Sequence, residues 1–390
     1  PTWLIASNEQ MAVNAARPEA YAKAVRQALA QKITPVDVSW LKSTDTQGKI
    51  REIRDFVAKG IRDAGPAFTQ LPLNCLTSAD KTLSDGYGNS ADRAILLASL
   101  LKAAGIDSRF LLVSGFPDLA AFRPGNGLLF MPGAYNQVLV AADGVLLNDT
   151  DQYAALGSTP HRGNLALDLD SGKIEAVKGE ADSTAIHYDI TLDEDGGAVI
   201  LEKRSYRGMA FAARNRLYSE MTPELKSRHQ QNMTTAISEN AVVLTPLKVT
   251  LSDSKCVEEL QVKVDRFAVR NGKYLQFNLP GNIAGSLIRP LPEKREYPYF
   301  ISSDNQVVLT YRIHTSDGLG IRGRMLPPEL DCPYVQVRSS EDRDGVAIEV
   351  KANFTPVILS TMDYLAFRAV QAKLGHPAMN VVLLETYGKK

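Results

Sequence analysis

One stretch, Lys81 to Phe110, constrains the fold of this chain more than any other. It reads KTLSDGYGNSADRAILLASLLKAAGIDSRF, which is typical of a glycine-containing turn, a helix and the start of a strand. Asn89 or Ser90 can cap the helix, Asp92 suits its first turn, and Gly105 can end it. The apolar residues between them are too dense for a helix with one exposed face. We therefore predict a central helix that is buried on most sides.

In other segments of the first half, local residue patterns also predict helices and strands. Residues 17–31 and 44–63 have helical spacing of apolar side chains, and Asp45 or Thr46 can cap the second of these helices. Residues 109–113 are predicted to form a strand. The segment YNQVLVAADGVLLNDTD is predicted to form a hairpin, because Asp143-Gly144 is a turn signal between two apolar runs.

The pattern changes to strands in the second half of the 390 residues. From about 159 to 183 the chain is polar and contains glycine, proline and serine, which favours a connection there. We predict an N-terminal helical or linker segment at 1–44, one domain at 45–175, and a β-rich domain at 176–390. Strands are expected on both sides of Glu194–Gly197 and near 257–267, 273–279, 305–314, 333–338 and 345–353. A helical insert beginning at Thr222-Pro223 and a helix over 360–374 accompany them, and 379–384 is predicted to be a final strand. The predicted fold class is α+β, with a mainly antiparallel second domain.

Composition excludes several classes of function. Lys+Arg and Asp+Glu are both 44, so charge gives no reason to expect a nucleic-acid partner. The sequence has no run of about 18 apolar residues, so no membrane span is predicted. Cys75, Cys256 and Cys332 lie far apart, so no disulfide framework is expected, although a single Cys256–Cys332 bridge stays open. The five histidines lack metal-binding spacings, and we predict no metal and no cofactor. The sequence opens at Pro1, as a processed or shortened form would.

The order of elements is that of a cysteine-nucleophile site in which residues have been exchanged. Such a site needs a nucleophile at the N-terminus of a buried helix, an imidazole on a neighbouring strand, and a carboxylate or amide that orients the imidazole. Ser90, Gln137 and Asp149 stand in these three places. No histidine lies between Ser90 and Asp149.

The hairpin register decides whether these side chains can meet. A two-residue turn at Asp143-Gly144 sets Val138 opposite Asp149 and puts Gln137 on the other face of the hairpin. A three-residue loop that includes Ala142 sets Gln137 opposite Asp149 instead. Both registers are allowed by the sequence, and the second brings the three side chains together.

The segments GYGNSADRAILLASLLKAAGIDSRFLLVSG, NQVLVAADGVLLNDTDQY and KIREIRDFVAKGIR resemble the bacterial transglutaminase-like superfamily. Its members typically read G-[DN]-C-x-D-[KR]-A at the helix start, followed by an N-H-V strand and a strand with Asp. The resemblance is specific over 45–165 and weaker over 185–390, which is similar to a β-rich domain of unknown function that often follows this module. It implies a papain-like fold in which the family cysteine falls on Ser90, the histidine on Gln137 and the aspartate on Asp149.

Two of the three family residues are therefore exchanged. A serine without a base is a poor nucleophile, and glutamine cannot accept and return a proton. We expect a catalytically inactive protein that binds peptide, protein or cell-envelope material, with Asn89, Tyr135, Asn136, Tyr153 and His161 as candidate cleft residues. The resemblance also implies an exported protein, periplasmic or at the cell surface.

Two alternatives stay open. One is an active hydrolase or acyltransferase, like a transglutaminase or protease, that uses Ser90 as nucleophile with a base such as His161. The other is a purely structural first half, with all contacts made by the β-rich domain.

Overall fold

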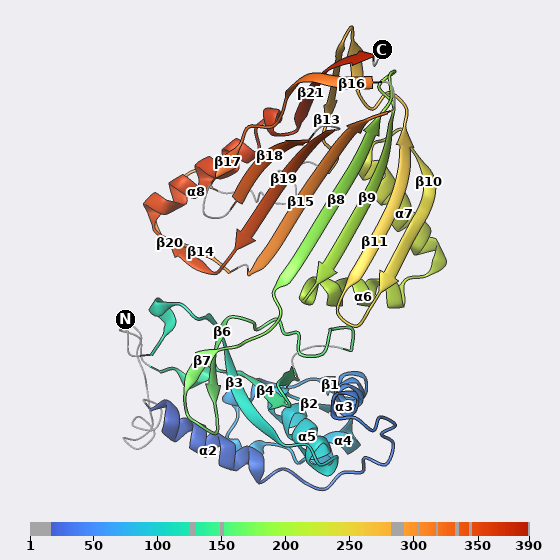
Figure 1. Ribbon diagram of the computed structural model, residues 1–390. Coiled ribbons are helices and arrows are strands. Elements are labelled where there is room, and N and C mark those ends of the chain that lie inside the picture. Colours follow the sequence, from blue (N-terminus) through green and yellow to red (C-terminus); the bar gives the residue numbers. More distant parts are fainter. Residues whose placement is uncertain are drawn as a thin grey trace. The chain divides into compact units, whose positions relative to one another are not determined.

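The computed structural model describes residues 17–124, 130–148, 152–281, 292–302, 304–316, 319–331, 335–342 and 345–388. It is a mixed α+β structure with several mostly antiparallel sheets. The chain divides into Pro1–Glu180, called unit 1 below, and Ala181–Lys390, called unit 2 (Figure 1). None of the described helices is both long and apolar enough to cross a membrane.

Unit 1 is built around the helix that the sequence predicted to be central. This helix, α5 (Ser90–Ala103), has eleven buried residues among its fourteen. The predicted helices before it also form, as α2 (Pro18–Ala30) and α3 (Thr46–Gly60). Asp45 caps α3, since its Oδ1 accepts a hydrogen bond from the Gly48 N–H at 2.8 Å. The remaining short elements before α5 are β1 (Arg62–Asp63), η1 (Phe68–Gln70), η2 (Leu73–Cys75), α4 (Ala79–Asp85) and β2 (Tyr87–Gly88).

A five-stranded antiparallel sheet with the order β5-β4-β3-β6-β7 follows α5. Its strands are β3 (Ser108–Pro117), β4 (Gln137–Ala142), β5 (Val145–Leu147), β6 (Asn164–Asp168) and β7 (Ile174–Ala176), with η3 (Ala120–Phe122) and η4 (Pro132–Ala134) between β3 and β4. One face, including Leu112 and Val138, packs into the same apolar core as α5. The other face carries a separate small cluster that includes Val113 and Leu139. The sheet therefore has a helix face and a second, outer face.

Strands β6 and β7 correct one expectation. The polar composition of 159–183 predicts a connection, but the structure places two strands of the unit 1 sheet within these residues. Leu165 and Leu167 point into the helix-side core, although polar residues surround them in the sequence. The strands are five and three residues long, which is too short for the alternation of apolar residues to stand out.

Unit 2 contains an eight-stranded sheet with the order β10-β11-β9-β8-β15-β19-β18-β17. The strands are β8 (Asp182–Leu192), β9 (Ala198–Arg207), β10 (Ala241–Leu251), β11 (Cys256–Val264), β15 (Asn305–Thr315), β17 (Leu330–Asp331), β18 (Val335–Asp342) and β19 (Gly345–Phe354). All neighbours pair antiparallel except β8 and β15, which are parallel from Asp182↔Asn305 onward. The predicted β8–β9 hairpin around Glu194–Gly197 is present.

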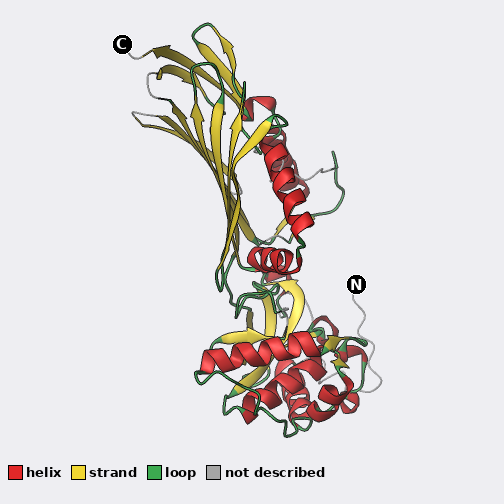
Figure 2. Cartoon of the chain, turned by 90° about the vertical axis from the view of Figure 1, so that its right-hand side faces the viewer, coloured by secondary structure: helices red, strands yellow, loops and turns green. Residues whose placement is uncertain are grey.

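Smaller sheets and helices complete unit 2. A four-stranded sheet has the order β12-β13-β21-β16 and a two-stranded one pairs β14 with β20. Their bounds are β12 (Val269–Asn271), β13 (Tyr274–Asn278), β14 (Tyr299–Ile301), β16 (Leu319–Met325), β20 (Val357–Leu359) and β21 (Val381–Gly388), and the helices are α6 (Met209–Glu220), α7 (Pro223–Ile237), α8 (Thr361–Leu374) and η5 (Pro377–Met379). Helix α6 and strand β10 are not predicted by the sequence, whereas helices α7 and α8 are. The helices of unit 2 gather on one face of the large sheet (Figure 2).

Candidate functional site

The start of α5 is buried and fully capped. Asn89 is the N-cap residue, and its Oδ1 accepts hydrogen bonds from the N–H groups of Ala91 and Asp92 at 2.9 and 3.2 Å. Asp92 returns the interaction, because its Oδ2 accepts from the Asn89 N–H at 3.2 Å. The Asn89 side chain is therefore engaged in this capping box. The sequence predicts Asn89 both as a possible cap and as a candidate cleft residue. Ser90 is consequently the first helical residue and not the cap.

The Ser90 side chain connects α5 to the sheet. Its Oγ accepts a hydrogen bond from the Val138 N–H of β4 at 2.7 Å. Ser90 is 8% exposed, so this bond lies away from solvent. A serine nucleophile must instead donate its proton to a base, and no described residue accepts a hydrogen bond from the Ser90 hydroxyl.

Asn148, immediately after β5, joins the same group of atoms. Its Nδ2 donates to the carbonyl oxygens of Ser90 at 2.7 Å and of Val138 at 2.6 Å. Asn148 is 7% exposed, has a φ of 85°, and its Oδ1 has no hydrogen-bond partner in the described part of the chain. We call Ser90, Val138 and Asn148 the Ser90 cluster; it contains no charged side chain. Sequence reasoning missed Asn148, although asparagine is enriched at positive φ and its place directly after an apolar run could have indicated it.

The hairpin adopts the first of the two registers that the sequence allowed. Ala142 pairs with Val145, so Asp143 and Gly144 form a two-residue turn, with φ values of 45° and 78°. Positive φ at both turn residues is the type I′ geometry that favours a tight hairpin. The three-residue loop, which would have brought the predicted trio together, is therefore wrong.

Strand alternation then separates Gln137 from the helix. Val138 belongs to the core on the α5 side, and Leu139 belongs to the cluster on the outer face. Gln137, as the neighbour of Val138 in β4, lies on the outer face with Leu139. It is half-buried and makes no hydrogen bond to Ser90. Asp149 lies outside the described residues.

The other candidate cleft residues differ in their burial and in their contacts. Tyr135 is 3% exposed and packs against Phe130 with ring centroids 5.3 Å apart, and burial raises its pKa to about 12. Asn136 and Tyr153 are half-buried. His161 is also half-buried, its backbone N–H donates to Thr159 Oγ1 at 3.1 Å, and burial lowers the pKa of its imidazole. No hydrogen bond or ion pair joins His161 to Ser90 among the described residues.

Metal binding and cysteine chemistry have little support in the described residues. These contain no group of three or more histidine, cysteine, aspartate or glutamate side chains that could hold a metal ion. Cys75 is exposed and Cys256 is buried, and both are free thiols. Burial raises the pKa of Cys256 to about 11, which disfavours a thiolate. Because Cys256 is a free thiol, the Cys256–Cys332 bridge that the sequence left open is not formed in this structure. Cys332 itself lies outside the described residues.

Unit 2 holds a second buried polar group that the sequence did not reveal. Glu258 of β11 is fully buried, and its carboxylate accepts hydrogen bonds from Tyr218 Oη at 2.6 Å and Tyr206 Oη at 3.1 Å. Arg214 Nη1 and His229 Nε2 each lie 3.8 Å from Glu258 Oε1. We call these five residues the Glu258 cluster. It joins β9 and β11 to α6 and α7.

Electrostatics within the Glu258 cluster follow from burial and from the central carboxylate. Burial, and then Glu258, raise the pKa of Tyr206 to about 12 and also raise that of Tyr218. Burial lowers the pKa of His229, although Glu258 opposes this shift. The Arg214 guanidinium also lies over the Tyr206 ring, 4.6 Å from its centroid. All of these contacts lie within unit 2.

Comparisons with known proteins place the fold but no family. No protein-family model matches the sequence, and no curated protein matches it. The structure is similar to a crystal structure from Parabacteroides distasonis that is described as a "putative protease", with a TM-score of 0.52 and 14% sequence identity. The match covers 93% of this chain and 58% of that protein, so this chain spans little more than half its length. At this identity the likeness concerns the fold alone.

Proposed function

We propose that this chain is a catalytically inactive transglutaminase-like protein that acts as a binding or assembly module for peptide or cell-envelope material. The observation that carries the proposal is the hydrogen bond from the Val138 N–H to Ser90 Oγ at 2.7 Å. The hydroxyl oxygen that would attack a carbonyl is used to fasten the helix to the sheet. It is buried and lacks a described base, so it has the surroundings of a structural serine.

The position that the family resemblance assigns to a histidine supports the same conclusion. Glutamine cannot take the proton of a nucleophile, and the strand alternation directs Gln137 toward the outer face. Loss of a triad member typically costs orders of magnitude in rate, and members that act as a unit are not additive. The two exchanges at Ser90 and Gln137 therefore remove both the nucleophile and its base.

The structural likeness supports the fold and carries no information about activity or ligand. A fold can host active and inactive members, so activity has to be argued from the site. The match to the Parabacteroides distasonis protein gives a precedent for the arrangement of elements over most of this chain. Retention of the scaffold without its chemistry favours binding as the remaining role. From the family resemblance we also propose that the protein is exported, to the periplasm or the cell surface.

The proposal is tested by intact-mass labelling of the folded protein with a serine-directed fluorophosphonate. We expect no adduct on Ser90, because its hydroxyl is not activated. The matched control is Ser90→Cys treated with iodoacetamide, since alkylation there shows that small reagents reach the position. An adduct that maps to Ser90 and disappears on unfolding would overturn the proposal.

Activity assays on the same protein preparation distinguish the proposal from the alternative of an active enzyme. An active hydrolase with His161 as base would show amidase or esterase turnover that His161→Ala abolishes. The proposal expects no turnover in either protein.

A further inference from the structure

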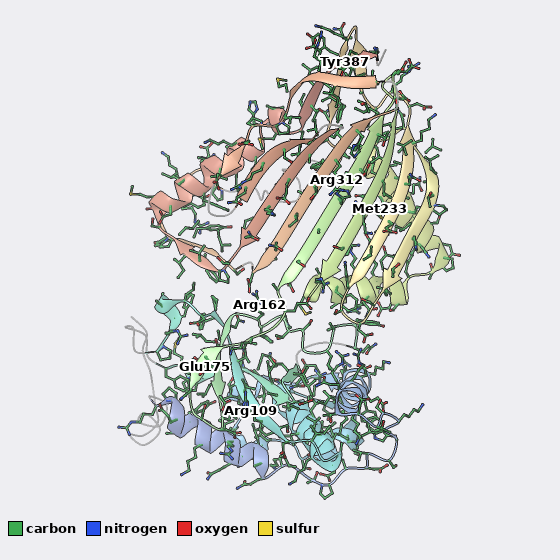
Figure 3. The ribbon with its side chains drawn as sticks, viewed as in Figure 1. Arg109, Arg162, Glu175, Met233, Arg312 and Tyr387 are labelled. Atoms are coloured by element: carbon green, nitrogen blue, oxygen red, sulfur yellow. The ribbon has the colours of Figure 1, made fainter. Side chains whose placement is uncertain are left out.

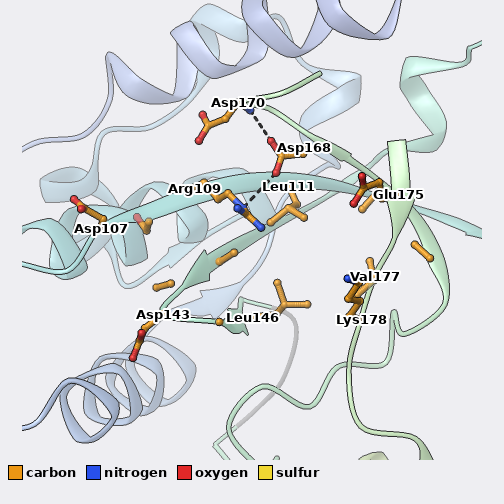
Figure 4. A pocket seen from close by; sticks show the side chains of 16 residues that line it. Asp107, Arg109, Leu111, Asp143, Leu146, Asp168, Asp170, Glu175, Val177 and Lys178 are labelled. Carbon is orange, nitrogen blue, oxygen red and sulfur yellow. Dashed lines mark hydrogen bonds and ion pairs between the residues drawn. The ribbon is translucent and has the colours of Figure 1, made fainter. Parts of the chain in front are cut away.

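Unit 1 carries a pocket of about 610 Å³ on the outer face of its sheet (Figure 4). Several charged side chains line it, and ion pairs within the chain already balance some of them. Arg109 Nε lies 3.3 Å from Asp168 Oδ2 (Figures 3 and 4), and Arg26 Nε lies 3.0 Å from Asp170 Oδ1. Because these charges are paired internally, they favour no class of ligand, and we assign none to this pocket.

Helix α8 of unit 2 carries apolar side chains on two opposite faces (Figure 1). One face includes Tyr364 and Phe367, which are buried in an apolar cluster. On the opposite face, Met362 is 80% exposed and Leu365 is 53% exposed. A helix that is apolar on all sides is normally covered on all sides. We call the exposed apolar residues, which follow one another at helical spacing, the α8 stripe: Met362, Leu365, Ala366 and Ala369.

A pocket of about 370 Å³ lies beside the C-terminal end of α8. Its lining includes Ala372 and Lys373 of α8, Leu330 of β17 and Met379 of η5, so it offers mainly apolar surface. Ala372 and Lys373 are exposed and come three and four residues after Ala369. They therefore continue the side of the helix that carries the α8 stripe. The protruding side chains of the stripe and the pocket lie at opposite ends of one helix face.

This face of α8 is complementary to itself when a second copy is turned about a two-fold axis. The axis passes between two antiparallel α8 helices, so the N-terminal half of one helix lies against the C-terminal half of the other. Met362 and Leu365 of each copy then meet the pocket of the other copy. Ala366 and Ala369 meet near the axis, where their small side chains let the two helices approach closely. Both pockets are filled at once.

The charges at the two ends of α8 favour the same antiparallel arrangement. Asp363 lies in the first turn and Lys373 in the last turn. Neither side chain has an ion pair within the described part of unit 2. An antiparallel pair brings Asp363 of one copy near Lys373 of the other, whereas a parallel pair brings like charges together. The dipoles of the two helices are also opposed in the antiparallel pair.

We infer that the α8 stripe and the neighbouring pocket form the contact through which two copies of this chain associate. The partner is a second copy, and the two α8 helices pack antiparallel. A contact along one helix of about 21 Å is smaller than the interfaces of about 1,200–2,000 Å² that hold stable complexes together. The dimer is therefore weak and depends on protein concentration. This inference goes beyond the proposed function and does not depend on the state of Ser90, which belongs to unit 1.

Sedimentation velocity of the full chain over a concentration series tests the inference. We expect the sedimentation coefficient to rise with concentration toward that of a dimer. Met362→Lys should weaken association about tenfold or more, because it empties the pocket of the other copy and places a cation near its Lys373. Met362 is 80% exposed, so the substitution is compatible with folding, which circular dichroism verifies. Met325→Lys is the matched control, since Met325 of β16 is 56% exposed and lies outside the α8 stripe, and it should leave association unchanged.

Charge reversals at the two ends of α8 test the antiparallel arrangement. Asp363→Lys and Lys373→Asp should each weaken association several-fold, because each places like charges opposite one another across the contact. The chain that carries both substitutions restores opposite charges at these positions and should associate more strongly than either single variant. Both residues are exposed, so the reversals are compatible with folding.

The possible outcomes separate this inference from the proposed function. A chain that stays monomeric at every concentration, or association that Met362→Lys leaves unchanged, overturns the inference. If the double charge reversal associates no better than the single variants, the antiparallel arrangement is wrong. A fluorophosphonate adduct on Ser90 overturns the inactive-module proposal, whatever the association state of the chain.

Discussion

The Ser90 cluster and the Glu258 cluster both bury polar side chains between a sheet and a helix, but they satisfy them in different ways. The Ser90 cluster is neutral, and its hydrogen bonds go mainly to backbone groups of α5 and β4. In the Glu258 cluster, side chains from β9, α6 and α7 converge on one carboxylate. Removal of one hydrogen-bonding group should therefore destabilise the Ser90 cluster less than removal of Glu258 destabilises the Glu258 cluster.

The two clusters differ in whether they hold a charged side chain. A nucleophile at the start of a helix needs a strained or charged environment for chemistry, whereas the Ser90 cluster has ordinary neutral hydrogen bonds. The Glu258 cluster keeps charge inside the protein, where it is tolerated only because partners surround it. In both clusters the polar groups fasten a helix to a sheet.

Removal of the central carboxylate should have the largest effect. Glu258→Ala leaves the Tyr206 and Tyr218 hydroxyls without the carboxylate that accepts their hydrogen bonds. It also removes the negative charge beside Arg214 and His229. Because hydrogen bonds to a charged group are strong, we expect a loss of about 3–5 kcal/mol in the free energy of unfolding. Urea unfolding followed by circular dichroism measures it. Trp40 fluorescence serves as the internal reference, because both tryptophans of the sequence, Trp3 and Trp40, belong to unit 1.

The control for this prediction is Glu258→Gln, which keeps an oxygen acceptor for the tyrosines and should cost less than the alanine variant. A loss below about 1 kcal/mol for Glu258→Ala would show that the cluster is no more demanding than an ordinary hydrogen bond.

Asn148→Ala should come next in size. It removes two hydrogen bonds from buried carbonyl oxygens, for which we expect a loss of about 2 kcal/mol. Trp40 fluorescence during urea unfolding reports it. Asn148→Gly loses the same bonds but accepts the φ of 85° without strain, so it should be less destabilising than alanine. Equal losses in the two variants would indicate that the backbone conformation at this position carries no strain.

Substitutions that introduce a cysteine at residue 90 and a histidine at residue 137 test the register. Ser90→Cys introduces a thiol at the start of α5, and its alkylation rate with iodoacetamide is measured against pH. A correctly positioned base contributes about a hundred-fold or more to a rate. Because Gln137 lies on the outer face, we expect the added Gln137→His substitution to change the rate by much less than this. A large acceleration in the double variant would show that residue 137 reaches the thiol, and the assigned face would be wrong.

The smallest effect is expected from pH. Burial lowers the folded-state pKa of His161, so the unfolded chain binds its proton more tightly. The stabilisation from keeping His161 neutral is complete above its unfolded pKa of about 6.5, decreases below it, and is lost once the pH has fallen through the lowered folded-state value. Unit 1, followed by Trp40 fluorescence, should therefore lose stability between pH 7 and 5.5. His161 is the only histidine in residues 1–180, so His161→Gln should remove this pH dependence. If the pH dependence persists in that variant, carboxylates and not His161 are its source.

Local signals in the sequence predicted much of unit 1. The density of apolar residues after Ser90 fixed a buried helix, and the Asp143-Gly144 pair fixed a hairpin turn, because both depend on neighbours in the chain. The register of that hairpin was not predictable, since two loop lengths use the same residues. Strand β6 was missed because its partner β3 is distant in sequence, and β7, which pairs with β6, is only three residues long.

The candidate site was predictable only in part for the same reason. The start of α5 and the approach of β4 followed from motifs, but the role of Asn148 depends on a positive φ that appears only in the folded chain. The Glu258 cluster gave no signal at all. Its members come from four separate elements, and none of them stands in a motif.

The parallel pairing of β8 with β15 has a consequence for how unit 2 is made. This pair divides the large sheet into two groups of antiparallel strands. One group lies within residues 182–264 and the other within residues 305–354. During synthesis the first group leaves the ribosome well before Asn305 exists to pair with Asp182. One edge of β8 is therefore exposed to other nascent chains until the second group arrives, which is a route to misassembly. A delay in translation between the two groups should lower the yield of folded protein more than the same delay after residue 354.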